Sequence, residues 1–494
     1  MKKFMNGFVK GVYTVLLVSI FAFITYYSIS NLVTGNYLSN SKLMIVAIVF
    51  YILIILALVL LTKITSKKIF FMIVTGMAIL VRIGWLIKVP TAPSSDFQMM
   101  HHAAILATQG DLSFLKESYF QSWPYQLGFV YFQALIIKIF GQNVLILQII
   151  NILLNCGIAF VGYKIINLHF KEITGRIVYT LLLFYPAYIY MTGVLTNQFL
   201  ATFLIYLAIY LYLKHDQLWV KATAGVLLAL GNMMRPLGIL LIIALVCFEI
   251  TKWLLAPDRE NILKSLGRVT TSVLAYFLML FLVNSALQVT HLSEYPLENR
   301  NPTWKFVLGL NDETVGSYSA TDLSLMNRYP LGAKRDKMGK EIIKERIQDK
   351  PKLVNLMFNK SKKMWTARDD ALMWGMADNV KLSLKIKNWL NAVQFLFYIF
   401  IVANALLAVF KWRETWTDGY LLKLMIIGYF MVHLLIEIQS RYRFFIVPAF
   451  IMLTAIGWVT VYEKIHSRQA NDKKTLKEDI VIRSVSYTHL RAHE

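Results

Sequence analysis

Cysteine, charge and recognisable catalytic motifs are all scarce in this chain. Only two cysteines occur among its 494 residues, Cys156 and Cys247, and both lie in hydrophobic runs without a nearby histidine or carboxylate. This pattern argues against a disulfide framework and against a thiolate metal site. The chain has no Gly-Lys-Thr phosphate loop, no HExxH pair and no GxSxG elbow. Soluble nucleotide chemistry is therefore not indicated.

Hydrophobic residues dominate instead. They make up 57% of the chain against 16% charged residues, and the mean hydropathy is +0.54. A helix needs about 20 apolar residues to cross the hydrocarbon core of a bilayer, and such runs recur, the first three over residues 11–30, 43–62 and 69–89. Lysines precede the first run, but its length and the lack of a small-residue cleavage site predict a retained anchor. We expect an all-α, polytopic integral membrane protein.

The distribution of basic residues predicts the topology. A net charge of +23 would suggest nucleic-acid binding in a soluble protein, but here the basic residues collect between apolar runs, where they mark the cytoplasmic side. We expect no nucleic-acid partner. With the basic stretches 63–68 and 462–468 in the cytoplasm, Asp96 and Arg441 lie at the outer face. The hydrophilic stretch 290–387 then forms a larger extracytoplasmic loop.

Two segments need a separate interpretation. Residues 340–364 have apolar side chains at helical spacing, which predicts an amphipathic helix on the membrane surface. Residues 126–140 form a 15-residue apolar segment with Lys138 near its end, which can lie along the interface, re-enter or cross at a tilt. The first two options give twelve spans and a crossing gives thirteen. We prefer twelve spans plus this partial one.

Asp96 is the principal candidate for chemistry. It is a lone carboxylate just past a hydrophobic span, near the N-terminus of a short helix expected to end at Gly110. The helix dipole there favours the ionised form, so its role would be base or cation ligand rather than acid. The alternative is a simple helix cap. His101 and His102 are adjacent and point to different faces, so we predict a metal-independent protein without a cofactor.

Arg441 and Arg443 lie where a late helix meets the outer surface. A spacing of four places His433, Glu437 and Arg441 on one face if the helix continues that far. A guanidinium held by Glu437, beside Tyr442, suits a lipid phosphate because it binds oxyanions with two N–H groups and stays charged. The alternative is an interfacial anchor that snorkels to water.

Two further positions complete the candidate set. Arg235 precedes a proline at a helix end on the same side as Asp96, which makes it a second phosphate candidate or a plain turn arginine. Trp123 and Tyr125 lie where the chain re-enters the membrane. Their rings either belong to the interfacial aromatic belt or stack on a sugar face.

The order of these motifs resembles a known superfamily. An outward Asp follows an arginine-bearing span, and after it come a Gly-Asp, a Tyr-Gln-Leu-Gly re-entry, a proline-containing turn, an Arg-Pro and a late Arg-Tyr. Over residues 71–465 this order resembles the GT-C membrane glycosyltransferases, specifically bacterial relatives of protein O-mannosyltransferases (glycosyltransferase family 39-like) and of the lipid A aminoarabinose transferase. Residues 304–311 are similar to an outer-loop segment of Gram-positive members.

The resemblance implies inverting transfer of a hexose from an undecaprenyl-phosphate donor, mannosyltransferase-like, at the outer face of a bacterial plasma membrane. The acceptor would be an envelope glycan, lipid or protein. Asp96 matches the family's essential acid and would accept or orient the acceptor hydroxyl proton, while Arg441, Arg443 and Arg235 would hold the lipid phosphate. Supporting roles would fall to Glu437, Tyr442, Asp111, Trp123 and Tyr125.

One departure from the family concerns a second acid. Many relatives have a Glu after the proline-containing turn, where this chain has Thr196-Asn197-Gln198. A second acidic role would therefore fall to Asp111 or Glu117, or be absent.

The predicted organisation follows from these assignments. It comprises an extra transmembrane hairpin (1–68), a GT-C-like core (69–289) with an amphipathic catalytic outer loop (90–125), the extracytoplasmic loop (290–387), C-terminal helices (388–462), a cytoplasmic tail (463–484) and a terminal stretch typical of adaptor read-through (485–494). Two other functions remain open. A lipid-linked-sugar flippase would use mid-bilayer polar groups such as Arg82 and related halves, which we do not find. A scaffold explains the spans but not the ordered charges.

Overall fold

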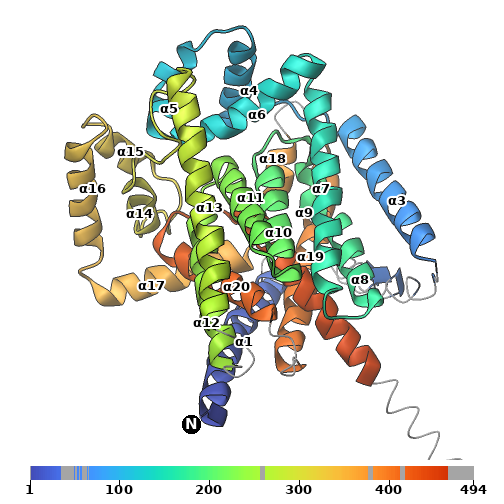
Figure 1. Ribbon diagram of the computed structural model, residues 1–494. Coiled ribbons are helices and arrows are strands. Elements are labelled where there is room, and N and C mark those ends of the chain that lie inside the picture. Colours follow the sequence, from blue (N-terminus) through green and yellow to red (C-terminus); the bar gives the residue numbers. More distant parts are fainter. Residues whose placement is uncertain are drawn as a thin grey trace, which may run out of the picture.

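The computed structural model describes residues 2–34, 66–255, 262–376, 382–411 and 418–464, with isolated residues between 49 and 64. All regular elements in these ranges are helical (Figure 1). The long or strongly apolar helices are α1 (Lys2–Thr34), α3 (Lys67–Lys88), α7 (Val144–Ile166), α10 (Gln198–Lys214), α11 (Leu218–Met234), α12 (Gly238–Leu255), α13 (Ile262–Val289), α19 (Leu384–Lys411), α20 (Gly419–Leu435) and a final helix over 447–464.

The remaining elements are short helices and single turns that connect the long ones. They are α4 (Ser95–Thr108), η1 (Ser113–Lys116), α5 (Ser118–Ser122), η2 (Pro124–Gln126), α6 (Leu127–Phe140), α8 (Glu172–Leu183), α9 (Pro186–Tyr190), η3 (Met191–Gly193), α14 (Trp304–Gly309), α15 (Ala320–Met326), α16 (Ala333–Arg346), α17 (Lys350–Ser361), η4 (Lys362–Thr366), α18 (Ala371–Gly375) and η5 (Ser440–Phe445).

The predicted class, an all-α polytopic membrane protein, is confirmed. Six described helices are long and apolar enough to cross a membrane, namely α1, α3, α7, α12, α13 and α19. Helices α10, α11 and α20 are equally apolar in character but 17 residues long. Most of the predicted span 43–62 lies outside the described residues, so the count of twelve or thirteen stays a prediction.

Small residues let the central helices approach closely, as is typical of helix interfaces in membranes. Gly225 of α11 faces the backbone of α13, where a Cβ would lie 2.2 Å from the carbonyl oxygen of Ser272. Gly231 meets the side chain of Ile205 of α10, where a Cβ would lie 2.7 Å from Cγ1. Helix α11 is therefore held tightly between two neighbours, and this fixes the position of its C-terminal end.

Helix α6 corresponds to residues 126–140, for which the sequence allowed either a membrane crossing or an interfacial position. Its 14 residues give a length of roughly 21 Å, which is short of the hydrocarbon thickness. In Figure 1 it runs across the end of the bundle beside α4, whereas α7 and α13 run along the bundle. This end lies opposite the N-terminus of α1.

The outer loop folds into helices with their own small core, on one side of the bundle (Figure 1). The single amphipathic helix predicted over 340–364 is wrong, because two helices, α16 and α17, occupy that stretch. Asp349 is the N-cap of α17, and its Oδ1 accepts a hydrogen bond from the Lys352 amide at 2.9 Å. Pro351 lies in the first turn of α17, where proline is favoured. A new helix therefore begins here and α16 does not continue. The core residues are Trp304, Val307, Leu308, Met326 and Ile342.

Candidate functional site

Asp96 lies in the first turn of α4. This helix lies at the end of the bundle opposite the N-terminus (Figure 1). Ser94 holds the N-cap position, so the alternative of a simple capping role for Asp96 does not hold. The residue between them, Ser95, has a φ of +51°, a conformation that side chains rarely adopt. The turn thus presents a half-buried carboxylate at a helix N-terminus.

Arg441 lies next to this carboxylate. Its guanidinium stacks on the ring of Trp374 at 4.1 Å and on that of Phe97, the neighbour of Asp96, at 5.3 Å. Its Nε donates to Gln439 Oε1 at 2.6 Å, but its buried Nη1 has no hydrogen-bond partner within the described ranges. A buried donor without a partner is costly, and an anionic ligand would satisfy it.

Arg235 and Tyr442 extend the cationic surface. Arg235 follows the last residue of α11, and its guanidinium lies over the Tyr442 ring at 4.8 Å. In the part of the chain that the structure describes, no hydrogen bond or ion pair engages the Arg235 side chain. Burial, and additionally the like charge of Arg235, lowers the pKa of Arg441. An anion between the two guanidinium groups would relieve this repulsion.

Lys305 is a site residue that the sequence analysis missed. From the first turn of α14 its Nζ pairs with Glu437, whose side chain is 3% exposed. The Glu437 amide also donates to the Lys305 carbonyl at 2.8 Å. The predicted pairing of Glu437 with Arg441 is wrong, because α20 ends at Leu435 and the chain continues extended. The only available signal was the similarity of residues 304–311 to an outer-loop segment of known transferases.

Arg443 faces away from this cluster. Its side chain is 1% exposed, its Nη1 donates to the Ala367 carbonyl at 2.9 Å, and its Nη2 lies 3.4 Å from Asp369 Oδ2. The guanidinium also stacks on Tyr398 at 4.4 Å. Burial raises the pKa of Asp369 to about 6, although Arg443 opposes the shift. These partners are all protein groups, so we remove Arg443 from the predicted phosphate-binding set.

The loop between α4 and α6 closes the site with aromatic side chains. Burial raises the pKa of Tyr125, and the positive charges of Lys305 and Arg235 partly oppose this shift. Trp123 packs edge-to-face on Tyr119 at 5.2 Å and against the outer-loop core. Tyr125 therefore belongs to the cationic cluster, whereas Trp123 joins the loop to the helices of residues 304–361.

The proposed second acids lie elsewhere. Asp111 follows the far end of α4, roughly 20 Å from Asp96 along the helix. It is exposed, and its Oδ1 accepts from the Ser113 amide at 2.8 Å, which lowers the pKa of its carboxyl. Glu117 is an exposed residue at the N-cap of α5. Neither carboxylate forms a described hydrogen bond or ion pair with Arg441 or Arg235. The structure therefore gives no support to the role predicted for Asp111.

No metal site is visible in the described part of the chain, which has no group of three or more His, Cys, Asp or Glu side chains able to hold an ion. His101 is buried, and its Nδ1 lies 3.1 Å from Gln133 Oε1 between α4 and α6. It packs two helices together. Metal independence stays a prediction.

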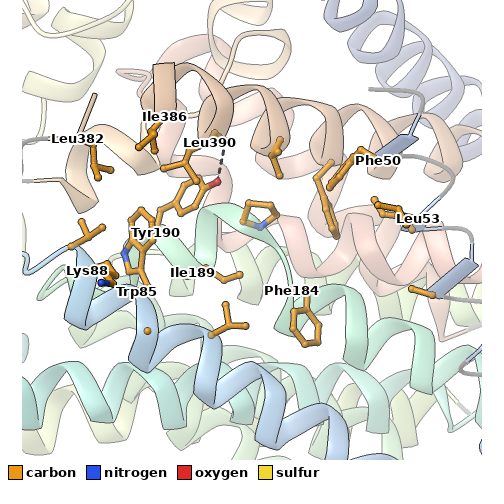
Figure 2. Close-up of a pocket in the computed structure, with 18 residues that line it drawn as sticks. Phe50, Leu53, Trp85, Lys88, Phe184, Ile189, Tyr190, Leu382, Ile386 and Leu390 are labelled. Carbon is orange, nitrogen blue, oxygen red and sulfur yellow. Dashed lines mark hydrogen bonds between the residues drawn. The ribbon is translucent and has the colours of Figure 1, made fainter. Parts of the chain in front are cut away.

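A separate apolar cavity of about 710 Å³ lies between α3, α9 and α19 (Figure 2). Trp85 and Tyr190 project into it, and the Tyr190 hydroxyl donates to the Leu390 carbonyl at 2.9 Å. Lys88 is the only charged residue among the described ones that line it. The described lining has no carboxylate and no arginine, which distinguishes this cavity from the cluster around Asp96.

No family model and no curated protein sequence matches this chain. Among solved structures, the Archaeoglobus fulgidus oligosaccharyltransferase tethered with an acceptor peptide superposes with a TM-score of 0.46 and 14% identity, over 82% of this chain and 51% of that one. ArnT from Cupriavidus metallidurans bound to undecaprenyl phosphate superposes with a TM-score of 0.38 and 12% identity, over 80% and 77%. Both are GT-C glycosyltransferases.

This chain spans about half the length of the oligosaccharyltransferase. The proposed function therefore rests on the residues of this chain.

Proposed function

We propose that the protein is a membrane glycosyltransferase that moves a hexose from an undecaprenyl-phosphate donor to an extracytoplasmic acceptor, an envelope glycan, lipid or protein. One observation carries the proposal. Asp96 lies at a helix N-terminus beside Arg441, whose guanidinium stacks on the adjacent Phe97 and has a buried N–H without a hydrogen bond among the described residues. Arg235, whose side chain makes no hydrogen bond or ion pair in the described ranges, stacks on the next residue, Tyr442.

The chemistry follows from this placement. The acceptor hydroxyl attacks the anomeric carbon, and Asp96 takes its proton as general base. The bond between the anomeric carbon and the phosphate oxygen breaks, and the phosphate leaves with the electron pair. Arg441 and Arg235 stabilise the charge that develops on that oxygen. A single displacement of this kind inverts the anomeric configuration.

The charges of the cluster fit a donor with one phosphate. Arg441, Arg235 and Lys305 contribute three positive charges, and Asp96 and Glu437 contribute two negative ones. The net charge of +1 (3 − 2) matches a sugar phosphodiester, which has one negative charge. A diphosphate donor would leave an excess negative charge that this cluster does not offset.

The orientation follows from the basic residues. Lysines near the N-terminus place the start of α1 in the cytoplasm, and α4 lies at the opposite end of the bundle (Figure 1). Asp96 would then act on the outer face of a bacterial plasma membrane. The flippase alternative gains nothing from Arg82, which is fully buried and donates to Asn155 of α7 and to the Ala78 carbonyl.

The test is transfer of labelled hexose from undecaprenyl-phosphate hexoses to envelope glycan, lipid and peptide acceptors by the purified protein in liposomes. Asp96→Asn should lower the transfer rate by roughly 10²- to 10⁴-fold, the usual contribution of a general base, while donor binding survives. Asp111→Asn, at the far end of the same helix, is the matched control and should retain activity. Labelled donor that crosses the bilayer without transfer, equally in both proteins, would contradict the proposal.

A further inference from the structure

We propose that Trp374 is a positioning residue, whose ring holds the guanidinium of Arg441 in place for a lipid phosphate without occupying the N–H groups that bind the phosphate. The inference rests on the proposed function, because it assigns the group that orients the phosphate-binding arginine. It gives α18, a short helix at the end of the outer loop, a role in the site.

Two aromatic rings hold the Arg441 guanidinium. Its central carbon lies 4.1 Å from the centre of the half-buried Trp374 ring and 5.3 Å from the centre of the Phe97 ring. The two rings also contact each other edge to face, with centroids 5.6 Å apart and planes inclined at 78°. A cation is attracted to a ring within about 6 Å of its centre, and most strongly to tryptophan. The shorter contact of Arg441 is therefore also the one with the more attractive ring.

This arrangement leaves donors of the arginine available. A guanidinium has five N–H groups, and the face of a ring attracts its charge without accepting these groups as a carbonyl oxygen would. Among the described residues, the Arg441 side chain donates only to Gln439, through Nε, and its buried Nη1 has no hydrogen-bond partner. Ring contacts can thus fix this guanidinium and keep its N–H groups for an oxyanion.

Helix α18 fixes the Trp374 ring relative to Arg441. The amide of Trp374 donates to the Asp370 carbonyl at 3.1 Å, and the amide of Asp370 donates to Ser440 Oγ at 3.0 Å. The Ser440 hydroxyl in turn donates to Asp370 Oδ2 at 2.5 Å. Ser440 directly precedes Arg441. The beginning of α18 is therefore bound to η5 at the residue next to the arginine that its tryptophan contacts.

The end of α18 is bound to the chain that leads to Asp96. The Gly375 carbonyl accepts a hydrogen bond from Thr91 Oγ1 at 2.6 Å, and Thr91 lies between α3 and α4. The contact between the Trp374 and Phe97 rings is a second link to α4. Trp374 therefore lies between the element that carries the proposed base and the element that carries the phosphate-binding cation.

The experiment measures the binding of undecaprenyl phosphate and of undecaprenol, which lacks the phosphate, to the purified protein in nanodiscs. Trp374→Leu should weaken the binding of undecaprenyl phosphate by roughly tenfold, as expected for a largely desolvated cation–π contact, and leave that of undecaprenol unchanged. Trp374→Phe keeps a ring and should stay within about threefold of the wild-type protein. Met373→Ala, at an exposed neighbour on the same helix, is the control and should bind both lipids as the wild type does.

A double variant tests whether the effect passes through Arg441. In an Arg441→Met background, Trp374→Leu should cause no further loss of undecaprenyl phosphate binding, because both changes act on the same cation.

Four outcomes would overturn the inference while leaving the proposed function intact. They are unchanged undecaprenyl phosphate binding in Trp374→Leu, equal weakening of both lipids by this variant, as large a loss in Trp374→Phe as in Trp374→Leu, and additive losses in the double variant. A wild-type protein that binds undecaprenyl phosphate no more tightly than undecaprenol would instead contradict the proposed function, and the inference with it.

Discussion

The short helix η5 has two arginines, Arg441 and Arg443, whose guanidinium groups lie in different surroundings. Arg443 on one side is 1% exposed and is bound by the Ala367 carbonyl, Asp369 and the Tyr398 ring. Arg441 on the other side is also largely covered. Each guanidinium has one buried nitrogen without a hydrogen bond among the described residues, Nη2 of Arg443 and Nη1 of Arg441. The Arg443 nitrogen lies 3.4 Å from Asp369 Oδ2, whereas no described carboxylate lies within ion-pair distance of Arg441. Burial alone therefore does not separate a structural arginine from a binding one. The difference lies in whether a described carboxylate of the protein forms an ion pair with the guanidinium.

The geometry of η5 explains how two arginines so close in sequence diverge. A 3₁₀ turn has three residues per turn, so residues two apart project in different directions. Arg443 turns inward to the chain that leads into α18, and Arg441 turns to α4. One turn thus anchors the end of the bundle and presents a cation to Asp96.

Replacing each arginine by methionine should distinguish the two roles most clearly. Arg443→Met leaves Asp369 as an unpaired buried charge and should lower the free energy of unfolding by about 3–5 kcal/mol. Arg441→Met removes the cation that we propose stabilises the leaving phosphate, and it should lower kcat by roughly 10²- to 10³-fold with little change in stability. Thermal unfolding and the transfer assay on both variants measure the two effects. Equal loss of stability in both would mean that Arg441 is structural as well.

The sequence predicted the fold and part of the site for identifiable reasons. A bilayer admits few architectures, so the long apolar runs were sufficient to predict the helical class. Asp96 and Arg235 were found because each follows the end of a helix. The contact of Lys305 with Glu437 could not be predicted, because it depends on how the outer loop docks on the end of α20. The role of Arg443 was wrong for a related reason, since its partner Asp369 comes from a distant loop.

The outer loop that supplies Lys305 is itself held by a buried cation. Lys360 of α17 is 1% exposed and donates to the carbonyls of Gly309, Leu434 and Ile436 at 2.6, 2.7 and 2.9 Å. These oxygens end α14 and α20, the two helices that carry Lys305 and lead to Glu437. Unlike Arg441, this cation has every N–H satisfied by protein.

Lys360→Met should therefore act on stability and on the site together. It removes the buried ammonium group that the three carbonyls share, and we expect a loss of about 3 kcal/mol of unfolding free energy. The donor KM should rise as well, because Lys305 is no longer held in place. Lys363→Met is the matched control, since that exposed lysine makes one bond, to the Thr314 carbonyl at 3.0 Å. Its effect should stay within about 0.5 kcal/mol. Similar losses for both would show that Lys360 does not support the site.

The smallest expected effect concerns Glu437, which neutralises Lys305 before a donor binds. Lys305 is 33% exposed, so solvent screens the pair, and Glu437→Gln should lower the free energy of unfolding by only about 1 kcal/mol. The same change removes a negative charge from the cluster, so the donor KM should fall a few-fold. A role restricted to folding would leave the donor KM unchanged.

The pH dependence of this variant adds a second check. Burial acts against ionisation of Glu437, but Lys305 and Gln439 outweigh it, and the pKa of Glu437 lies below its ordinary 4.5. A lowered carboxyl pKa gives stability that is complete above the ordinary value and is lost as the pH falls through the lowered one. The stability difference between wild type and Glu437→Gln should thus be constant from about pH 7 to pH 5 and shrink below about pH 4.5. A difference that already shrinks near pH 6 would show that Lys305 does not hold Glu437 ionised.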